Sequence, residues 1–160
     1  MTEATTKDTP GSPILLVEDD ENDVILLRRA FSQAHVTNRL VVVSDGEAAI
    51  AYLSNQAPYE DRVAFPTPIL VLLDLKLPRK SGLEVLEWLK EQTSIRRTPV
   101  VVLTSSAESR DINRAYDLGA NSYLVKPVRF SDLADMVRTL DLYWMILNTR
   151  PLIAPSSPTS

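Results

Sequence analysis

Ile14-Leu15-Leu16-Val17-Glu18-Asp19-Asp20-Glu21-Asn22-Asp23 is the segment from which the architecture can be worked out. It joins four aliphatic residues directly to six positions of which five are acidic. A short, continuous apolar run is typical of a strand in a parallel sheet that is covered on both faces. Acidic groups held within about 4–6 Å raise one another's pKa, so the cluster needs a cation or a basic side chain. The segment therefore predicts a buried strand that ends at a charged site.

Four more apolar runs of strand length follow, and segments with the apolar spacing of amphipathic helices separate them. Gly119 stands where the fourth helix should stop, and Ser131 is placed as the N-cap of the fifth. Five repeats of strand and helix predict an α/β fold: a doubly wound five-stranded parallel sheet of the flavodoxin-like type, with helices on both faces. The four further strands are expected at Leu40–Val43, Ile69–Leu73, Val100–Leu103 and Tyr123–Val125.

Composition fits one soluble globular domain. The chain has 160 residues, 44% of them apolar and 24% charged, with a net charge of −4. The acidic balance argues against a nucleic-acid partner, and the lack of cysteine agrees with a reducing cytoplasm. We find no signal-peptide pattern and no apolar run long enough to span a membrane. We expect a polar tail at 1–12, the domain at 13–148 and a Pro/Ser-rich arm at 149–160.

The ends of the predicted strands carry the chemistry. In an open parallel sheet, ligands bind beyond the carboxyl ends of the strands, near the point where the strand order reverses. Carboxylate oxygens are ligands that Mg²⁺ prefers, and a carboxylate is also a nucleophile toward phosphorus when the charge on the phosphoryl group is neutralised. Asp74 could attack while Glu18 and Asp19 hold the metal, Lys126 supplies a positive charge and Thr104 donates its hydroxyl. The strand-end residues are Glu18 and Asp19, Asp74, Thr104, and Lys126.

Taken together, these motifs resemble the receiver domain of bacterial two-component response regulators. The resemblance covers roughly residues 12–147 and lies in Val-Glu-Asp-Asp (17–20), Leu-Leu-Asp-Leu-Lys-Leu-Pro (72–78), Ser-Gly-Leu-Glu-Val-Leu (81–86), Val-Val-Leu-Thr-Ser-Ser (101–106) and Asn-Ser-Tyr-Leu-Val-Lys-Pro (121–127). It implies that Asp74 accepts a phosphoryl group from a histidine kinase. It also implies an Mg²⁺ site and a switch, together with a cis peptide bond between Lys126 and Pro127. The implied metal ligands are Glu18, Asp19, Asp74 and the backbone carbonyl of Lys76, and the implied switch residues are Thr104, Tyr123 and Lys126.

A closer similarity is to the small single-domain regulators paired with cyanobacterial and bacterial phytochromes. It rests on residues 14–31, on the long loop before the third strand and on Leu-Asp-Leu-Tyr-Trp-Met-Ile-Leu-Asn-Thr-Arg-Pro at 140–151. This similarity implies a phytochrome-like kinase as the partner. One position departs from the receiver pattern: Lys76 is a long cation where smaller or polar residues are common, and it puts the lifetime of the phosphorylated state in doubt.

Three alternatives stay open at this point. A haloacid-dehalogenase-like phosphatase would need a second aspartate two residues after the nucleophile, where this chain has Lys76. A flavodoxin-like binding protein would bring a phosphate to the end of the first strand, where Glu18 and Asp19 would repel it. A phosphorylation-silent pseudo-receiver is the third. The remaining acids of the first helix, Asp20, Glu21 and Asp23, are interpreted as capping and solvated groups.

The C-terminal helix is apolar around its whole circumference in its last turns. One buried stripe accounts for Leu140, Trp144 and Leu147, yet further apolar side chains surround it. An apolar patch left on a monomer usually marks a partner. We therefore predict a homodimer through the C-terminal helix and arm. The additional apolar residues are Leu142, Tyr143, Met145, Ile146, Leu152 and Ile153.

Overall fold

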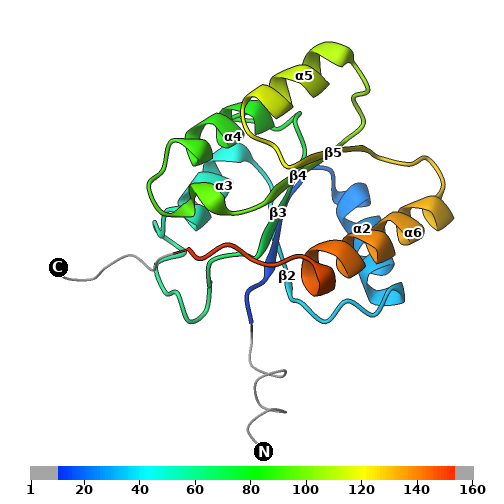
Figure 1. Cartoon of the computed structure of the whole chain (residues 1–160), viewed down its shortest axis with the longest axis horizontal. Coiled ribbons are helices and arrows are strands. Elements are labelled where there is room, and N and C mark those ends of the chain that lie inside the picture. Colours follow the sequence, from blue (N-terminus) through cyan, green and yellow to red (C-terminus); the bar gives the residue numbers. More distant parts are fainter. Residues whose placement is uncertain (1–10, 154–160) are drawn as a thin grey trace, which may run out of the picture.

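The structure is a computed structural model that describes residues 11–153. Five strands alternate with helices along the chain (Figure 1). The tail predicted at 1–12 and the arm at 149–160 lie largely outside the described residues, so this division of the chain stays a prediction. The elements are β1 (Ile14–Val17), α2 (Glu21–Gln33), β2 (Leu40–Val43), α3 (Gly46–Leu53), β3 (Leu70–Leu73), α4 (Gly82–Lys90), η1 (Ile95–Arg97), β4 (Val100–Thr104), α5 (Ser109–Asp117), β5 (Ser122–Val125), α6 (Phe130–Leu140) and the π-helical η2 (Asp141–Leu147).

The strands form one parallel sheet in the order β2-β1-β3-β4-β5. The chain runs from β1 outward to β2 and then back to β3 on the other side of β1, so the strand order reverses between β1 and β3. Val17 pairs in register with Leu73, which means that the residues following these two strands leave the sheet at the same level. The predicted doubly wound parallel sheet is confirmed, and its reversal point lies between the two strands that carry the acidic residues.

Helices cover both faces of the sheet (Figure 1). Successive strand residues point to opposite faces, so Leu15 and Val17 join the core under α3, α4 and α5, while Ile14 and Leu16 join the core under α2 and α6. All four of these β1 side chains are buried. Burial on both faces explains why the run is apolar without alternation, as the sequence indicated.

Two details at the C-terminal helix differ from expectation. Ser131 is not the N-cap, because the helix already begins at Phe130, whose ring lies 4.9 Å below the guanidinium of Arg29 on α2. The α-helix ends at Leu140 and continues as the wider π-helix, in which Asn148 donates to the carbonyl of Tyr143 at 2.7 Å. Gly119 ends α5 as predicted, with a φ of +102° that favours glycine.

Candidate metal centre

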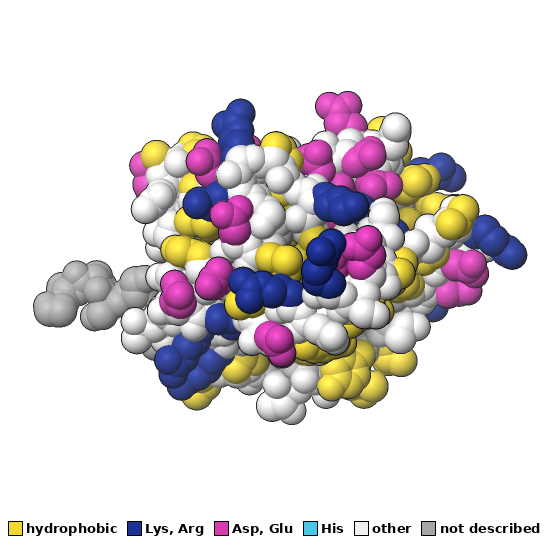
Figure 2. Space-filling view, turned by 90° about the horizontal axis from the view of Figure 1, so that it is seen from above, with side chains coloured by type: hydrophobic (Ala, Val, Ile, Leu, Met, Phe, Trp, Pro, Cys, Tyr) yellow, Lys and Arg dark blue, Asp and Glu magenta, His cyan; other side chains and the backbone are white. Residues whose placement is uncertain are grey.

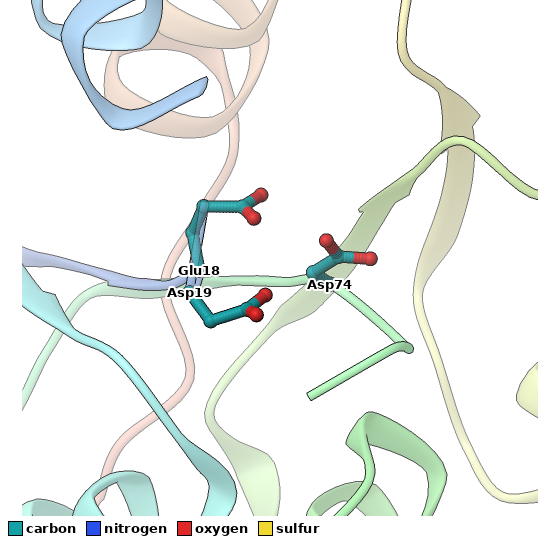
Figure 3. A group of neighbouring side chains, drawn as sticks. All are labelled: Glu18, Asp19 and Asp74. Atoms are coloured by element: carbon teal, nitrogen blue, oxygen red, sulfur yellow. The ribbon is translucent and has the colours of Figure 1, made fainter. Parts of the chain in front are cut away.

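Three carboxylates meet where β1 and β3 end. Glu18 and Asp19 follow β1 and Asp74 follows β3, and the amide of Asp74 donates to the carbonyl of Val17 at 3.1 Å. In Figure 3 the carboxylates of Glu18 and Asp19 both point to the side on which Asp74 lies. One oxygen from each of the three residues lies within 4.8 Å of the others. Such a set of hard oxygen donors fits Mg²⁺ or Mn²⁺, so the acidic cluster could hold a divalent metal.

The ammonium of Lys126 lies among these acids. Its Nζ donates to Glu18 Oε1 at 2.6 Å, to Asp23 Oδ2 at 2.7 Å and to Asp74 Oδ2 at 3.0 Å. The backbone positions the side chain, because the amide of Lys126 donates to the carbonyl of Thr104 at 2.8 Å as β5 leaves the sheet. A single ammonium faces several carboxylates, so negative charge is left over for a divalent cation.

Burial governs the charge state of Glu18. Its side chain is only 1% exposed. Desolvation is the main effect that raises the pKa of Glu18 from its ordinary 4.5 to about 7; the charge of Asp74 adds to the rise, and the hydrogen bond from Lys126 opposes it. Burial alone would lower the pKa of Lys126, but its bonds to Asp23 and Glu18 and the charge of Asp74 outweigh burial and raise it. Lys126 therefore stays charged in this site.

A tight loop fixes the backbone of Asp74. The amide of Lys76 approaches Asp74 Oδ1 at 3.4 Å, and the amide of Gly82 donates to the carbonyl of Leu75 at 2.9 Å. A Cβ on Gly82 would lie 2.2 Å from the carbonyl oxygen of Asp74, so only glycine lets α4 begin here. The side chain of Lys76 is exposed and forms no ion pair with Glu18 in the part of the chain that the structure describes.

Thr104 and Tyr123 lie beside this cluster in different states. Thr104 is fully buried, and its Oγ1 has no hydrogen-bond partner among residues 11–153. The hydroxyl of Tyr123 donates to the carbonyl of Ser106 at 2.9 Å. Ser106 Oγ in turn bonds Asp111 Oδ2 at 2.5 Å. Tyr123 is thus already tied to the loop after β4, whereas the threonine hydroxyl lacks a partner.

Asp23 is the site residue that the sequence interpretation missed. Asp20 does cap α2 as expected, accepting from the amide of Asn22 at 2.8 Å. Asp23, however, is not simply solvated, because it turns back from the first helical turn to Lys126. The position of Asp23 in the sequence could have indicated this contact, because the third residue of a helix that starts directly after a strand can reach over the end of that strand.

The expected cis peptide between Lys126 and Pro127 is wrong. Within residues 11–153, the cis bond is the one between Ala57 and Pro58. An X-Pro bond favours the trans form by about 0.5–1 kcal/mol. Lys126 makes its backbone and side-chain hydrogen bonds while the peptide bond to Pro127 stays trans.

Comparison with known proteins agrees with this geometry. Residues 14–138 match the family model described as the response regulator receiver domain. The chain belongs to the response regulator receiver family. This membership rules out the phosphatase and flavin-binding alternatives. Receiver domains typically act in signalling and not as enzymes.

Among known receivers, the chain is similar to the response regulators Rcp1 and RcpA, and RcpA is described as a phytochrome response regulator. It is 39% identical over 142 residues to Response regulator Rcp1 of a Synechocystis species, covering 89% of this chain and 95% of that protein. The phosphorylated cyanobacterial phytochrome response regulator RcpA has a TM-score of 0.81 at 38% identity, with 88% of this chain and 99% of that chain covered. The Mn²⁺-bound form of Rcp1 has a TM-score of 0.79 at 39% identity and the same coverage. A related receiver thus binds a divalent metal, as the acidic cluster here would.

Proposed function

We propose that the chain is a single-domain response regulator that accepts a phosphoryl group on Asp74 from a histidine kinase. The observation that carries this proposal is the Asp74 carboxylate, which lies 3.0 Å from the Lys126 ammonium and beside the two further acids Glu18 and Asp19. Coverage of nearly the whole length of Rcp1 supports a regulator that works through protein contacts.

In this proposal, a carboxylate oxygen of Asp74 attacks the phosphorus of a kinase phosphohistidine. A new P–O bond forms as the P–N bond breaks, and the histidine nitrogen leaves with the electron pair. Glu18, Asp19, Asp74 and the carbonyl of Lys76 would hold Mg²⁺, which would neutralise charge on the phosphoryl group. Lys126 donates a hydrogen bond to a phosphoryl oxygen and so keeps the charge on the acyl phosphate balanced.

The switch is proposed to use Thr104 and Tyr123. The Thr104 hydroxyl, which bonds no other described residue, can donate to a phosphoryl oxygen on Asp74, and this bond would draw the segment 104–106 toward the site. Because Tyr123 is bonded to Ser106, its side chain would move with the loop. The face formed by α5, β5 and α6 would change in consequence. Phosphorylation thus acts as a local charge event on a two-state element.

The partner kinase is proposed to be phytochrome-like. The support is the similarity to RcpA, which is described as a phytochrome response regulator, and to the response regulator Rcp1. We place the protein in the cytoplasm with no nucleic-acid or membrane partner. Basic and acidic side chains are interspersed over the face seen in Figure 2. Within residues 11–153, the helices are too short or too polar to cross a membrane.

We also propose a homodimer through η2 and the arm that follows it. Four apolar side chains of η2 are about half or more exposed, and Leu152 beyond it is 87% exposed. Two such patches could cover each other about a twofold axis. The four are Leu142, Tyr143, Ile146 and Leu147, so the assignment of Leu147 to the buried stripe is wrong.

Mass spectrometry after incubation with Mg²⁺ and acetyl phosphate tests the phospho-acceptor. The chain should gain one phosphoryl group as acetate leaves, and the gain should be absent with EDTA and in Asp74→Asn. Asp135→Asn, which changes an exposed acid on α6, is the control and should be phosphorylated normally. Modification that persists in Asp74→Asn would exclude Asp74 as the acceptor, and no modification of the unaltered chain would indicate a phosphorylation-silent receiver.

A further inference from the structure

Asp23 is the partner of Lys126 that is not among the proposed metal ligands. We propose that Asp23 is a positioning residue: it keeps the Lys126 ammonium at the rim of the site when a divalent cation takes over Glu18 and Asp74. This inference rests on the proposed function, because it presumes a metal bound by those two carboxylates.

The three partners of Lys126 differ in depth. The side chain of Glu18 is 1% exposed and that of Asp74 is 9% exposed, whereas that of Asp23 is 32% exposed. The ammonium therefore bridges two carboxylates inside the site and one at its edge. The edge position is fixed by the fold, because Asp20 caps α2 and sets the first helical turn.

Competition for oxygen atoms gives Asp23 its role. A divalent cation and an ammonium repel each other, and both need the carboxylates of Glu18 and Asp74. If these were the only partners, metal binding would either leave Lys126 without a partner or be opposed by it. Asp23 is already 2.7 Å from the ammonium, so Lys126 can give up its inner bonds and keep an outer one. Its flexible side chain then remains within reach of a phosphoryl group on Asp74.

Calorimetric titration with Mg²⁺ at constant ionic strength tests this role. Asp23→Asn should weaken Mg²⁺ binding about threefold to tenfold more than Glu21→Gln does. Glu21 is the matched control, since it is an exposed acid in the same helical turn and does not bond Lys126. Its substitution removes the same charge, so it reports the long-range electrostatic loss alone.

The decisive comparison repeats both substitutions in a Lys126→Met background, or in Lys126→Gln if the methionine variant does not fold. There, Asp23→Asn and Glu21→Gln should weaken Mg²⁺ binding equally, because no ammonium is left to position. Equal effects already in the unaltered chain, tighter Mg²⁺ binding in Asp23→Asn, or an excess that persists without the lysine would each overturn the inference. If the unaltered chain binds no Mg²⁺, the proposed metal site itself fails, and this result is distinguishable from the others.

Discussion

Glu18 gives the metal-free protein a pH-dependent stability. Its pKa is raised to about 7 in the folded state, so the folded protein holds this proton more tightly than the unfolded chain does. The stability that this provides is complete below about pH 4.5 and is lost as the pH rises through about 7. We expect Glu18 to account for a fall of about 1–3 kcal/mol in the free energy of unfolding between pH 5 and pH 8.

Urea denaturation in EDTA checks this prediction with Glu18→Gln. The variant should lose less stability than the unaltered chain over that pH range, because the amide does not ionise. Glu47→Gln, an exposed acid at the start of α3, should keep the original pH dependence. If Glu18→Gln and the unaltered chain fall in parallel, the carboxyl group is not protonated in the folded protein.

Thr104 carries a buried hydroxyl that has no hydrogen-bond partner in the described part of the chain, which usually costs stability. Thr104→Val keeps the shape and removes the hydroxyl. The free energy of unfolding of the unphosphorylated variant should therefore equal that of the unaltered chain or exceed it by about 1 kcal/mol, as measured by urea denaturation. A loss of more than about 1 kcal/mol would mean that the hydroxyl is bonded in the resting protein. Thr98→Val is a matched control, because Thr98 is equally buried and its hydroxyl also has no partner within residues 11–153, yet it precedes β4 at the opposite end of that strand.

Single residues were predictable from sequence where a strand end alone places them. Glu18, Asp19, Asp74 and Lys126 each follow an apolar run, and parallel strands bring their carboxyl ends to one edge. The ion pair of Asp23 with Lys126 was not predictable from sequence, because it depends on how the first turn of α2 is oriented over that edge.

At the scale of elements, α3 begins against the loop that follows Asp74. Gly46 is its first residue, and a Cβ there would lie 2.1 Å from the carbonyl oxygen of Lys80 and 2.6 Å from the Cβ of Lys80. The backbone of Lys80 cannot move out of the way as easily as the end of a flexible side chain could. We expect Gly46→Ala to displace the segment 76–80, to lower the free energy of unfolding by about 1–3 kcal/mol and to slow phosphorylation by acetyl phosphate.

Gly119→Ala is the control that distinguishes displacement of the segment 76–80 from a general loss of stability. This glycine has a positive φ, so alanine is strained there, but the nearest atoms belong to the side chain of Lys90. It should lower stability while the phosphorylation rate at a temperature where both variants are folded stays unchanged. Equal phosphorylation rates in Gly46→Ala and Gly119→Ala would show that the start of α3 does not position the loop.

Elements were predictable to the extent that burial leaves a mark in the sequence. The strands lie within one residue of their predicted bounds. In β1, β3 and β4, burial on both faces makes the run continuously apolar, whereas the edge strands β2 and β5 are only partly buried. The change from α6 to η2 was not predictable. The sequence of Asp141–Leu147 suits α- and π-helical hydrogen bonding alike, and in the π-helix Trp144 and Met145 pack against the core under α2 and α6.

For the whole molecule, the exposed side of η2 is the feature that a single domain does not explain. If the proposed homodimer forms there, a charge placed in the patch should abolish it, because two buried charges would then face each other without partners. We expect the unaltered chain to dimerise at high micromolar concentration in at least one phosphorylation state. Ile146→Glu should be monomeric at the same concentrations, as measured by analytical ultracentrifugation.

Val128→Glu is the control for the dimer prediction, because Val128 lies far from the patch on η2. Val128 is fully exposed in the segment before α6, and helix residues rise about 1.5 Å each, so it lies roughly 20 Å or more from the centre of the patch. Val128→Glu adds the same charge and should leave dimerisation unchanged. Loss of the dimer in Val128→Glu but not in Ile146→Glu would move the interface to the face of α5, β5 and α6. A chain that stays monomeric with and without phosphorylation would mean that the apolar side of η2 serves another partner.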